Sequence, residues 1–315
     1  MGLDPNAQEL IELLQSDGAR ALADLSPTEA RDQLARQVRE QDENASGEGA
    51  AIPGGTRTIP IRVHRPAGDG YRASLPTLVY CHGGGWVIGE LRACAGRAQG
   101  LADHAGCLVI TVDYRLAPEN RFPAALDDVS AAVAWLGEHA GSLGGDPGRL
   151  ALLGDSSGGN LAAAASLRAR DEDGPAIACM VLACPVLDLE FSSESMKSNA
   201  EGYLLERRDL HWCWHHYLAS EADRHNPYAV PARATSLTGL PPTLIITAEF
   251  DPLRDQARAF GERLKREGVP SKVSNYAGVM HAFVEYEQLD QAPAALAETA
   301  AFLRRAWDRE PGLCP

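Results

Sequence analysis

Short apolar runs alternate with longer segments of helical periodicity along most of the 315-residue chain. The apolar runs, which we expect to be strands, are residues 58–64, 77–81, 108–113, 150–153, 180–184, 243–248 and 272–276. The helical patterns are residues 93–104, 124–138, 159–170, 255–267 and 293–307. Such alternation is typical of a mostly parallel sheet with helices packed against it. The sequence therefore predicts an α/β fold.

Two segments do not follow this alternation. Residues 4–42 form an amphipathic N-terminal segment rich in helical patterns. The Gly- and Ala-rich stretch ASGEGAAIPGG after it is interpreted as a linker. Residues 187–231 contain loops and one aromatic helix at about 205–218. Open α/β sheets bind ligands at the carboxyl ends of their strands, so we expect both segments to cover that edge. The predicted organisation is N-terminal cap helices (1–45), a first core part (46–186), a cap insertion (187–231) and a second core part (232–315).

Charge and composition exclude several classes of partner. A net charge of −14 repels nucleic-acid backbones and anionic membranes. The longest apolar run, residues 176–189, is interrupted by Pro185 and is shorter than the roughly 20 residues of a membrane helix. The first residues lack a secretory signal pattern, and the seven cysteines lack metal-site spacing. We therefore expect a cytoplasmic protein with free, buried thiols.

The stretch GDSSGGN, which begins at Gly154, lies between a predicted strand and a predicted helix. A G-x-S-x-G nucleophile elbow requires this context. With Ser156 at the centre the flanking residues are Gly154 and Gly158, whereas with Ser157 at the centre the upstream residue is Asp155 and the motif fails. A helix cap or a phosphate-binding turn is the alternative, although no Lys follows as a P-loop requires. We predict that Ser156 is a nucleophile and that Ser157 contributes its backbone N–H.

A nucleophilic serine needs a base and an acid, in the chain order Ser, acid, His. Only one of the nine histidines, His281, follows the predicted strand 243–248, and it lies in a loop after the next strand. Asp251 comes directly after strand 243–248 and is the predicted acid. Its rivals are Glu249, still on the strand side of the turn, and Asp255, one helical turn further on.

Three consecutive glycines, Gly83, Gly84 and Gly85, follow the predicted strand 77–81. Without side chains, their backbone N–H groups can approach a substrate carbonyl closely. An ordinary flexible loop is the alternative. The position directly after a buried strand favours an oxyanion hole.

Five motifs together resemble the bacterial hormone-sensitive-lipase-like esterases of the α/β-hydrolase superfamily. They are HGGGW (82–86), DYRLAPENRFPAALDD (113–128), GDSSGG (154–159), DPLRD (251–255) and His281 followed by Phe283. The resemblance extends from about residue 55 to the end of the chain. It implies an α/β-hydrolase fold in which Ser156 is the nucleophile, His281 the general base and acid, and Asp251 its orienting partner.

The resemblance also implies an oxyanion hole made by the amides of Gly84, Gly85 and Ser157, with Gly83 shaping the turn. Family members commonly carry Ala where Ser157 stands. The charges of residues 113–128 are expected to support the loops around the site, and the two cap segments to line acyl and alcohol pockets. The candidate pocket residues are Trp86, Asp155, Leu205 and Trp212.

The predicted function is a carboxylesterase that hydrolyses short- to medium-chain small-molecule esters through an acyl-enzyme, without metal or cofactor. An amidase or lactonase with the same triad is one alternative. A binding protein such as the plant gibberellin receptors, which lack the catalytic histidine, is another, and the presence of His281 disfavours it. His211 and His215 have the spacing of two metal ligands on a helix, but no third ligand accompanies them. A homodimer is expected from the resemblance alone.

Overall fold

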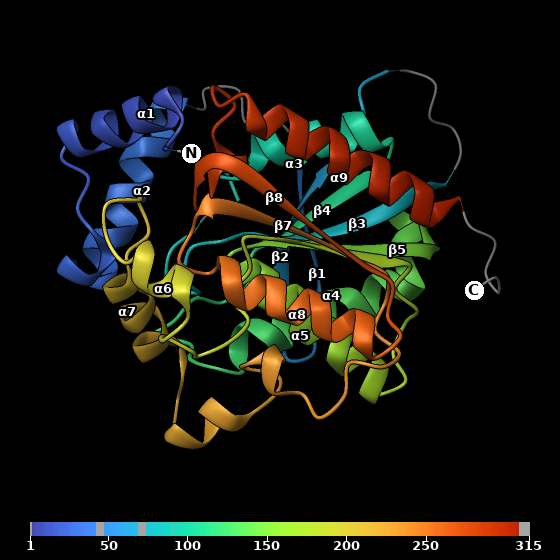
Figure 1. Ribbon diagram of the computed structural model, residues 1–315. Coiled ribbons are helices and arrows are strands. Elements are labelled where there is room, and N and C mark those ends of the chain that lie inside the picture. The colour runs from blue at the N-terminus through green and yellow to red at the C-terminus, as the bar shows by residue number, and fades with distance from the viewer. Residues whose placement is uncertain (1, 42–46, 69–73, 90, 309–315) are drawn as a thin grey trace.

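The computed structural model describes residues 2–41, 47–68, 74–89 and 91–308. An eight-stranded sheet with the order β1-β2-β4-β3-β5-β6-β7-β8 forms its centre (Figure 1). The strands are β1 (Glu48–Gly54), β2 (Arg57–His64), β3 (Leu75–Cys81), β4 (Leu108–Val112), β5 (Gly145–Asp155), β6 (Cys179–Ala183), β7 (Thr243–Phe250) and β8 (Ser271–Met280). The pairs β1–β2 and β2–β4 are antiparallel, and all other pairs are parallel. The predicted α/β fold with a mostly parallel sheet is confirmed.

Each strand predicted from the sequence is present, and β5 and β8 extend furthest beyond their predicted bounds. β5 already begins at Gly145, which pairs with Leu75 of β3 before the register shifts at an irregularity. β8 continues to Met280. The extra length of β8 brings the chain to the sheet edge directly before His281.

The interpretation of residues 45–55 as a linker is wrong, because residues 48–54 form the edge strand β1. Ile52 lies opposite Ile59 of β2, and both side chains are buried. Gly, Ala and Pro have low β propensity, which hides this strand in the sequence. An edge strand tolerates them, because it needs ladder hydrogen bonds on only one side.

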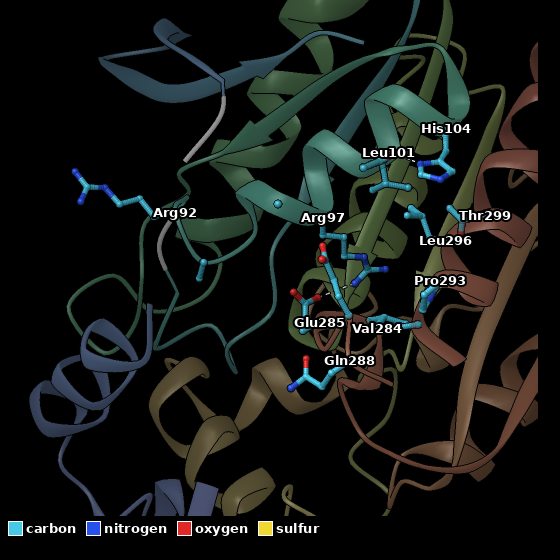
Figure 2. A pocket seen from close by; sticks show the side chains of 15 residues that line it. Arg92, Arg97, Leu101, His104, Val284, Glu285, Gln288, Pro293, Leu296 and Thr299 are labelled. Carbon is cyan, nitrogen blue, oxygen red and sulfur yellow. Dashed lines mark hydrogen bonds and ion pairs between the residues drawn. The ribbon is translucent and has the colours of Figure 1, made fainter. Parts of the chain in front are cut away.

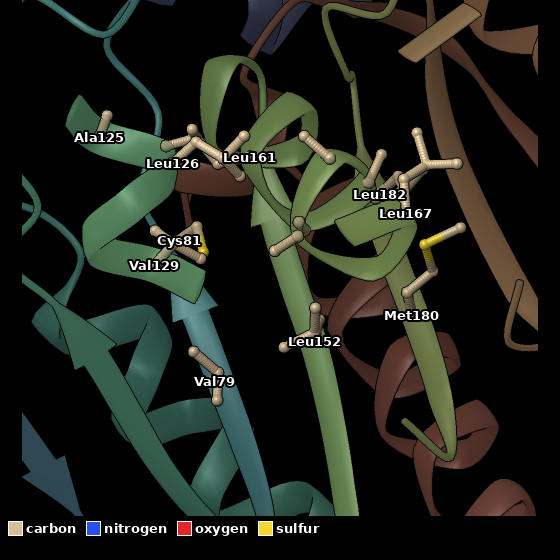
Figure 3. Close-up of a cluster of buried hydrophobic side chains, with 14 of the residues drawn as sticks. Val79, Cys81, Ala125, Leu126, Val129, Leu152, Leu161, Leu167, Met180 and Leu182 are labelled. Atoms are coloured by element: carbon tan, nitrogen blue, oxygen red, sulfur yellow. The ribbon is translucent and has the colours of Figure 1, made fainter. Parts of the chain in front are cut away.

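Helices cover both faces of the sheet (Figure 1). Those on one face are α4 (Ala124–His139), α5 (Ser157–Asp171) and α8 (Arg254–Arg266), and those on the other are α3 (Ala95–Ala105) and α9 (Gln291–Trp307). Apolar side chains form one buried cluster against each face. Figure 3 shows Leu126 of α4 beside Leu161 of α5, and Val129 of α4 beside Cys81 of β3. The predicted helices between and after the core strands are all present.

Helix α5, which follows the turn at Ser156, is buried along its first three turns, from Ser157 to Leu167. Its sequence in this part consists mainly of Gly, Ala and Leu. Ala has the highest helix propensity, and its small side chain allows a helix to approach the sheet closely. The turn at Ser156 therefore rests on a buried helix.

The two segments outside the alternation pack against each other on one side of the sheet (Figure 1). The first contains α1 (Pro5–Ser16), the 3-10 helix η1 (Leu22–Asp24) and α2 (Pro27–Gln41); the second contains α6 (Glu194–Ser198), α7 (Arg207–Tyr217), η3 (Glu221–His225) and η4 (Pro231–Arg233). The Asp209 carboxylate accepts hydrogen bonds from the amide of Ala23 at 2.9 Å and from that of Glu206 at 3.0 Å. The Trp212 Nε1–H donates to the carbonyl of Leu25 at 3.0 Å. Helix α7, the predicted aromatic helix, thus holds the N-terminal segment in place.

The described cysteines are buried free thiols, as predicted: Cys81, Cys94, Cys107, Cys179, Cys184 and Cys213. Burial raises the pKa of Cys107 and of Cys179 to about 12, so both are protonated at neutral pH. Cys314 lies outside the described residues. Across the described ranges, none of the helices has both the length and the hydropathy needed to span a bilayer.

Candidate active site

Ser156 occupies a sharp turn between β5 and α5, with φ 52° and ψ −118°. Such a conformation is strained for a residue with a side chain. A Cβ on Gly154 would lie 2.1 Å from the carbonyl oxygen of Gly158, and one on Gly158 would lie 2.0 Å from that of Cys81. The close approach of strand and helix therefore requires glycine at both flanking positions.

The side chains of Ser156, His281 and Asp251 form a continuous hydrogen-bonded line. His281 Nε2 lies 3.0 Å from Ser156 Oγ, and His281 Nδ1 lies 2.9 Å from Asp251 Oδ2. Asp251 is fully buried and His281 is 5% exposed, whereas Ser156 is half-buried, so the His281–Asp251 end of the line is shielded from water. When Nδ1–H donates to Asp251, Nε2 is the nitrogen that can accept the serine proton. Ser157 instead is fully buried at the start of α5.

Adjacent strands bring the three residues together. Asp251 follows β7 and His281 follows β8, and these strands pair in parallel, so both residues emerge at the same edge. The amide of Leu253 donates to Asp251 Oδ1 at 2.8 Å and fixes this carboxylate. The two rival acids have other partners: Glu249 accepts from the Gly278 amide at 2.9 Å, and Asp255 from the Ser195 amide at 2.8 Å.

The glycine loop after β3 is shaped by its surroundings. Gly84 has φ 112° and Gly85 has φ 60°, values that favour glycine. A Cβ on Gly84 would lie 2.1 Å from the carbonyl oxygen of Ile88, and one on Gly83 would lie 2.3 Å from Asp155 Oδ2. Within the described residues, the amides of Gly84 and Gly85 donate to no protein acceptor, which leaves them free for a ligand.

The amide of Ser157 is at the first position of α5, where helix N–H groups have no partner in the helix. Among the described residues it also donates to no other acceptor. The positive end of the helix dipole favours negative charge at this point. This amide and those of the glycine loop are the groups for which the sequence predicted an oxyanion-binding role.

Of the four predicted pocket residues, Trp86 is the most enclosed. It is 1% exposed and stacks on Tyr217 of α7, with ring centroids 4.1 Å apart and an interplanar angle of 4°. Trp212 and Leu205 are half-buried, and Asp155 is 7% exposed. Trp86 thus joins the glycine loop to α7, and whether any of the four contacts a substrate remains a prediction.

The histidines of the predicted metal alternative have aromatic neighbours. His211 stacks on Phe191 with centroids 4.0 Å apart, and His215 lies against His216. Among the described residues, the metal-ligand types that cluster are Cys184, Asp251 and His281, with ligand atoms within 4.8 Å of one another. Two of these are already hydrogen-bonded in the Ser156 line.

Cys184 is a neighbour of the site that the sequence did not single out. It is fully buried directly after β6, with φ 44°. Burial and the nearby Asp251 carboxylate raise the pKa of its thiol, so the sulfur stays protonated. The sequence places Cys184 at the carboxyl end of the predicted strand 180–184, and this position could have indicated that it lies near the site.

Two ion-pair systems support the loops around the site. Arg31 of α2 donates to the carbonyls of Val87 at 2.9 Å and Ala117 at 2.7 Å and pairs with Glu119 at 2.6 Å. The Arg31 guanidinium holds the pKa of Glu119 down to about 2. Arg115 and Arg57 both pair with the buried Asp128, at 2.9 and 2.6 Å. The charges of the 113–128 motif thus fix the loops, as expected.

A hollow lies away from the Ser156 line (Figure 2). It has a volume of about 640 Å³ and lies between α3, η5 (Phe283–Glu285) and α9. Its lining includes Arg97, Leu101, Glu285 and Leu296, but neither Ser156 nor His281. This cavity is therefore separate from Ser156 and His281. Arg97 and Glu285 in its lining also form a charge cluster with Asp155, which directly precedes Ser156.

A family model described as an alpha/beta hydrolase fold matches residues 78–285. The esterase LipI of Mycobacterium tuberculosis is 39% identical over 251 residues, which cover 79% of this chain and 78% of LipI. An arylesterase of Saccharolobus solfataricus is 37% identical over 227 residues, covering 72% of this chain and 73% of that protein. The crystal structure of a thermostable esterase from Pseudomonas putida superimposes with a TM-score of 0.92 at 34% identity, covering 98% of this chain and 99% of the other. This chain therefore belongs to the hormone-sensitive-lipase-like esterases of the α/β-hydrolase superfamily.

Proposed function

We propose that this carboxylic ester hydrolase cleaves short- to medium-chain esters through an acyl-enzyme, with Ser156 as nucleophile, His281 as general base and acid, and Asp251 as the orienting carboxylate. The observation that carries this proposal is the pair of distances, 3.0 Å from Ser156 Oγ to His281 Nε2 and 2.9 Å from His281 Nδ1 to Asp251 Oδ2. A serine hydroxyl becomes nucleophilic when a positioned imidazole removes its proton.

In the acylation half, Ser156 Oγ attacks the ester carbonyl while His281 Nε2 takes the hydroxyl proton. Asp251 stabilises the imidazolium through Nδ1–H. The oxyanion of the tetrahedral intermediate accepts hydrogen bonds from the amides of Gly84, Gly85 and Ser157, with Gly83 shaping the loop. These amides have no other acceptor among the described residues, which supports this assignment.

The intermediate collapses when His281 returns its proton to the leaving alcohol, which leaves the acyl group on Ser156. Water then attacks the acyl-enzyme, with His281 again as base and the same amides around the oxyanion. Release of the carboxylic acid restores the Ser156 hydroxyl. No redox or metal step is needed for these bond changes.

The preference for short and medium acyl chains rests on the contacts of the two cap segments. Arg31 of α2 bonds to the carbonyl of Val87, directly after the glycine loop, and Trp86 stacks on Tyr217 of α7. A cap packed this closely against the oxyanion loop limits the room beside Ser156. Residues 1–45 and 187–231 as cap units, and Trp86, Asp155, Leu205 and Trp212 as pocket residues, are part of the same proposal.

We place the reaction in the cytoplasm, where a reducing medium keeps thiols free, and the six buried free cysteines suit such a compartment. The partner in this scheme is a small-molecule ester, and a homodimer follows from the family resemblance. Light scattering on the purified protein measures the oligomeric state directly.

The test compares hydrolysis of p-nitrophenyl butyrate by the wild type, Ser156→Ala and Ser157→Ala. Loss of the nucleophile of such a triad lowers turnover by on the order of 10⁶-fold, whereas Ser157→Ala keeps its amide and loses far less. Equal activity of all three proteins would disprove the assignment. The matched p-nitroanilide and a lactone separate esterase from amidase and lactonase activity, because only esterase activity is expected to be high.

A further inference from the structure

A charge cluster of Arg97, Asp155 and Glu285 lies beside the Ser156 turn and takes no part in the bond changes described above. Arg97 of α3, whose side chain is 10% exposed, lies with Nη1 2.7 Å from Glu285 Oε1 and 3.8 Å from Asp155 Oδ1. Its guanidinium carbon is 5.7 Å from the centre of the Tyr80 ring. Figure 2 shows Arg97 and Glu285 joined at the wall of the cavity between α3 and α9. One cation is thus shared by two carboxylates.

These carboxylates belong to the two chain segments that carry the reacting side chains. Asp155 directly precedes Ser156, and Glu285 follows His281 by one turn, in η5. Arg97 therefore contacts both the nucleophile turn and the histidine loop from a third element. Neither segment can shift without changing the geometry of the Arg97 contacts.

The Asp155 carboxylate also lies against the oxyanion loop. A Cβ on Gly83 would be 2.3 Å from Asp155 Oδ2, so this oxygen packs directly on the loop backbone. A buried negative charge at this point opposes the negative charge that develops on the substrate oxygen, and burial strengthens that repulsion. A neighbouring cation offsets it, and Arg97 is the cation paired with Asp155.

We propose that Arg97 is a positioning residue for ester hydrolysis, which offsets the charge of Asp155 beside the oxyanion hole and links the Ser156 turn to the His281 loop. This inference rests on the proposed function, because it assumes that Ser156 and His281 carry the reaction. Arg97 touches neither substrate nor reacting atoms, and it acts through Asp155 and Glu285.

The state of Glu285 agrees with this role. Burial and the Asp155 carboxylate outweigh the attraction of Arg97 and raise the pKa of Glu285 to about 7. The titratable and charged groups around it are Asp155 from the end of β5, Arg97 from α3, Tyr80 from β3, Cys94 at the start of α3 and the neighbouring Tyr286. When Glu285 holds a proton, the charge of Arg97 is left to offset Asp155.

A double-mutant cycle of Arg97→Met and Asp155→Asn tests the proposal on the full-length protein, with p-nitrophenyl butyrate as substrate. An oxyanion donor itself contributes roughly 10²-fold or more, so an indirect charge is expected to contribute less. We expect Arg97→Met to lower kcat on the order of 10-fold with little change in KM. Asp155→Asn in the Arg97→Met background recovers most of this loss, because the uncompensated charge is gone.

The pH profile of kcat/KM provides a readout that a purely structural role does not move. In Arg97→Met, the unpaired Asp155 favours the imidazolium of His281, so the acid limb moves to higher pH. In the double variant, the acid limb returns to its position in the wild type. Of the other titratable groups near His281, Asp251 and Cys184 are the same in all variants. Glu285 loses its Arg97 partner, so the profiles are also measured with Glu285→Gln in each background, which removes its titration.

Two outcomes overturn the proposal: a kcat for Arg97→Met equal to that of the wild type, or a loss that Asp155→Asn does not recover. If Arg97→Met fails to fold, Arg97→Lys and Arg97→Gln replace it. The proposal then requires that Arg97→Lys, which keeps the positive charge, has a higher kcat than Arg97→Gln and the acid limb of the wild type. Equal kcat values and pH profiles of these two variants contradict the proposal. Ser156→Ala in the same assay separates the hypotheses, because activity in that variant overturns the proposed function itself.

Discussion

A methyl group on Gly85 would lie 2.3 Å from the sulfur of Cys213, so the glycine loop and helix α7 are in direct contact. The residue after Gly85, Trp86, stacks on Tyr217 of the same helix. The conformation of the proposed oxyanion loop therefore depends on helix α7 as well as on the sheet.

Gly85→Ala is expected to lower kcat by about 10²-fold, the effect of losing one oxyanion donor. The new methyl group meets Cys213, and φ at Gly85 is 60°, so the loop must move. Cys213→Ala in the same chain removes the contact with the sulfur, although the Cβ at 3.1 Å remains, and recovers part of the activity, but not the part due to φ. Gly141→Ala is the control, because nothing lies within 4 Å of its added methyl group. Equal kcat for Gly85→Ala and Gly141→Ala would contradict the role of the loop.

Asp251→Asn is expected to lower kcat by about 10⁴-fold, because the amide no longer holds His281 in the tautomer that accepts the Ser156 proton. Asp255→Asn is the matched control. Asp255 accepts the Ser195 amide at 2.8 Å and lies outside the hydrogen-bonded line, so its loss affects stability more than turnover. Steady-state kinetics and thermal melts of both variants distinguish the two effects. A larger kcat loss in Asp255→Asn would identify Asp255 as the acid.

A series of p-nitrophenyl esters from acetate to palmitate measures the acyl preference. We expect butyrate to be hydrolysed faster than palmitate, because the cap segments pack against the loop beside Ser156. The comparison is made below the concentration at which the long esters aggregate. Faster hydrolysis of palmitate would show that the cap does not limit chain length.

His64 makes the fold sensitive to acid. It is fully buried at the end of β2, and burial together with Arg62 lowers its pKa from 6.5 to about 4. Between these values the unfolded chain binds a proton that the folded protein does not, so the free energy of unfolding decreases as pH falls through this window. The loss is at most about 3 kcal/mol. Urea unfolding from pH 7.5 to 4.5 measures it.

His64→Leu is expected to flatten this pH dependence, since the substituted side chain binds no proton. The exposed His139→Leu is the control and leaves the slope unchanged. An unchanged slope in His64→Leu would show that other groups cause the acid sensitivity.

The sequence predicted most of the fold because the core strands are short, continuous apolar runs. It predicted Ser156, and not Ser157, as the centre of the elbow because the motif has glycines at fixed spacing. The structure shows why these glycines are needed, since a Cβ at Gly154 or Gly158 would collide with backbone atoms. β1 was missed because a half-exposed edge strand needs only one buried apolar side chain, Ile52.

The charge cluster lay beyond sequence reasoning. Arg97 and Glu285 are 188 residues apart, and the segments around them contain no spacing that indicates a pairing. Their contact exists only because α3 and η5 meet at the edge of the folded sheet. Likewise, the sequence places Trp86 directly after a motif glycine, but only the structure shows that its ring stacks on Tyr217 of α7. Contacts between distant segments decide such features.

The bond from the Ala23 amide to Asp209 joins residues 186 positions apart. During synthesis, ribosomes add about 5–20 residues per second, so η1 waits roughly 10–40 s before α7 emerges to receive it. In that interval the amphipathic N-terminal helices exist without the surface that buries them. The nascent chain thus passes through a stage in which its N-terminal helices depend on chaperones or their own solubility for protection.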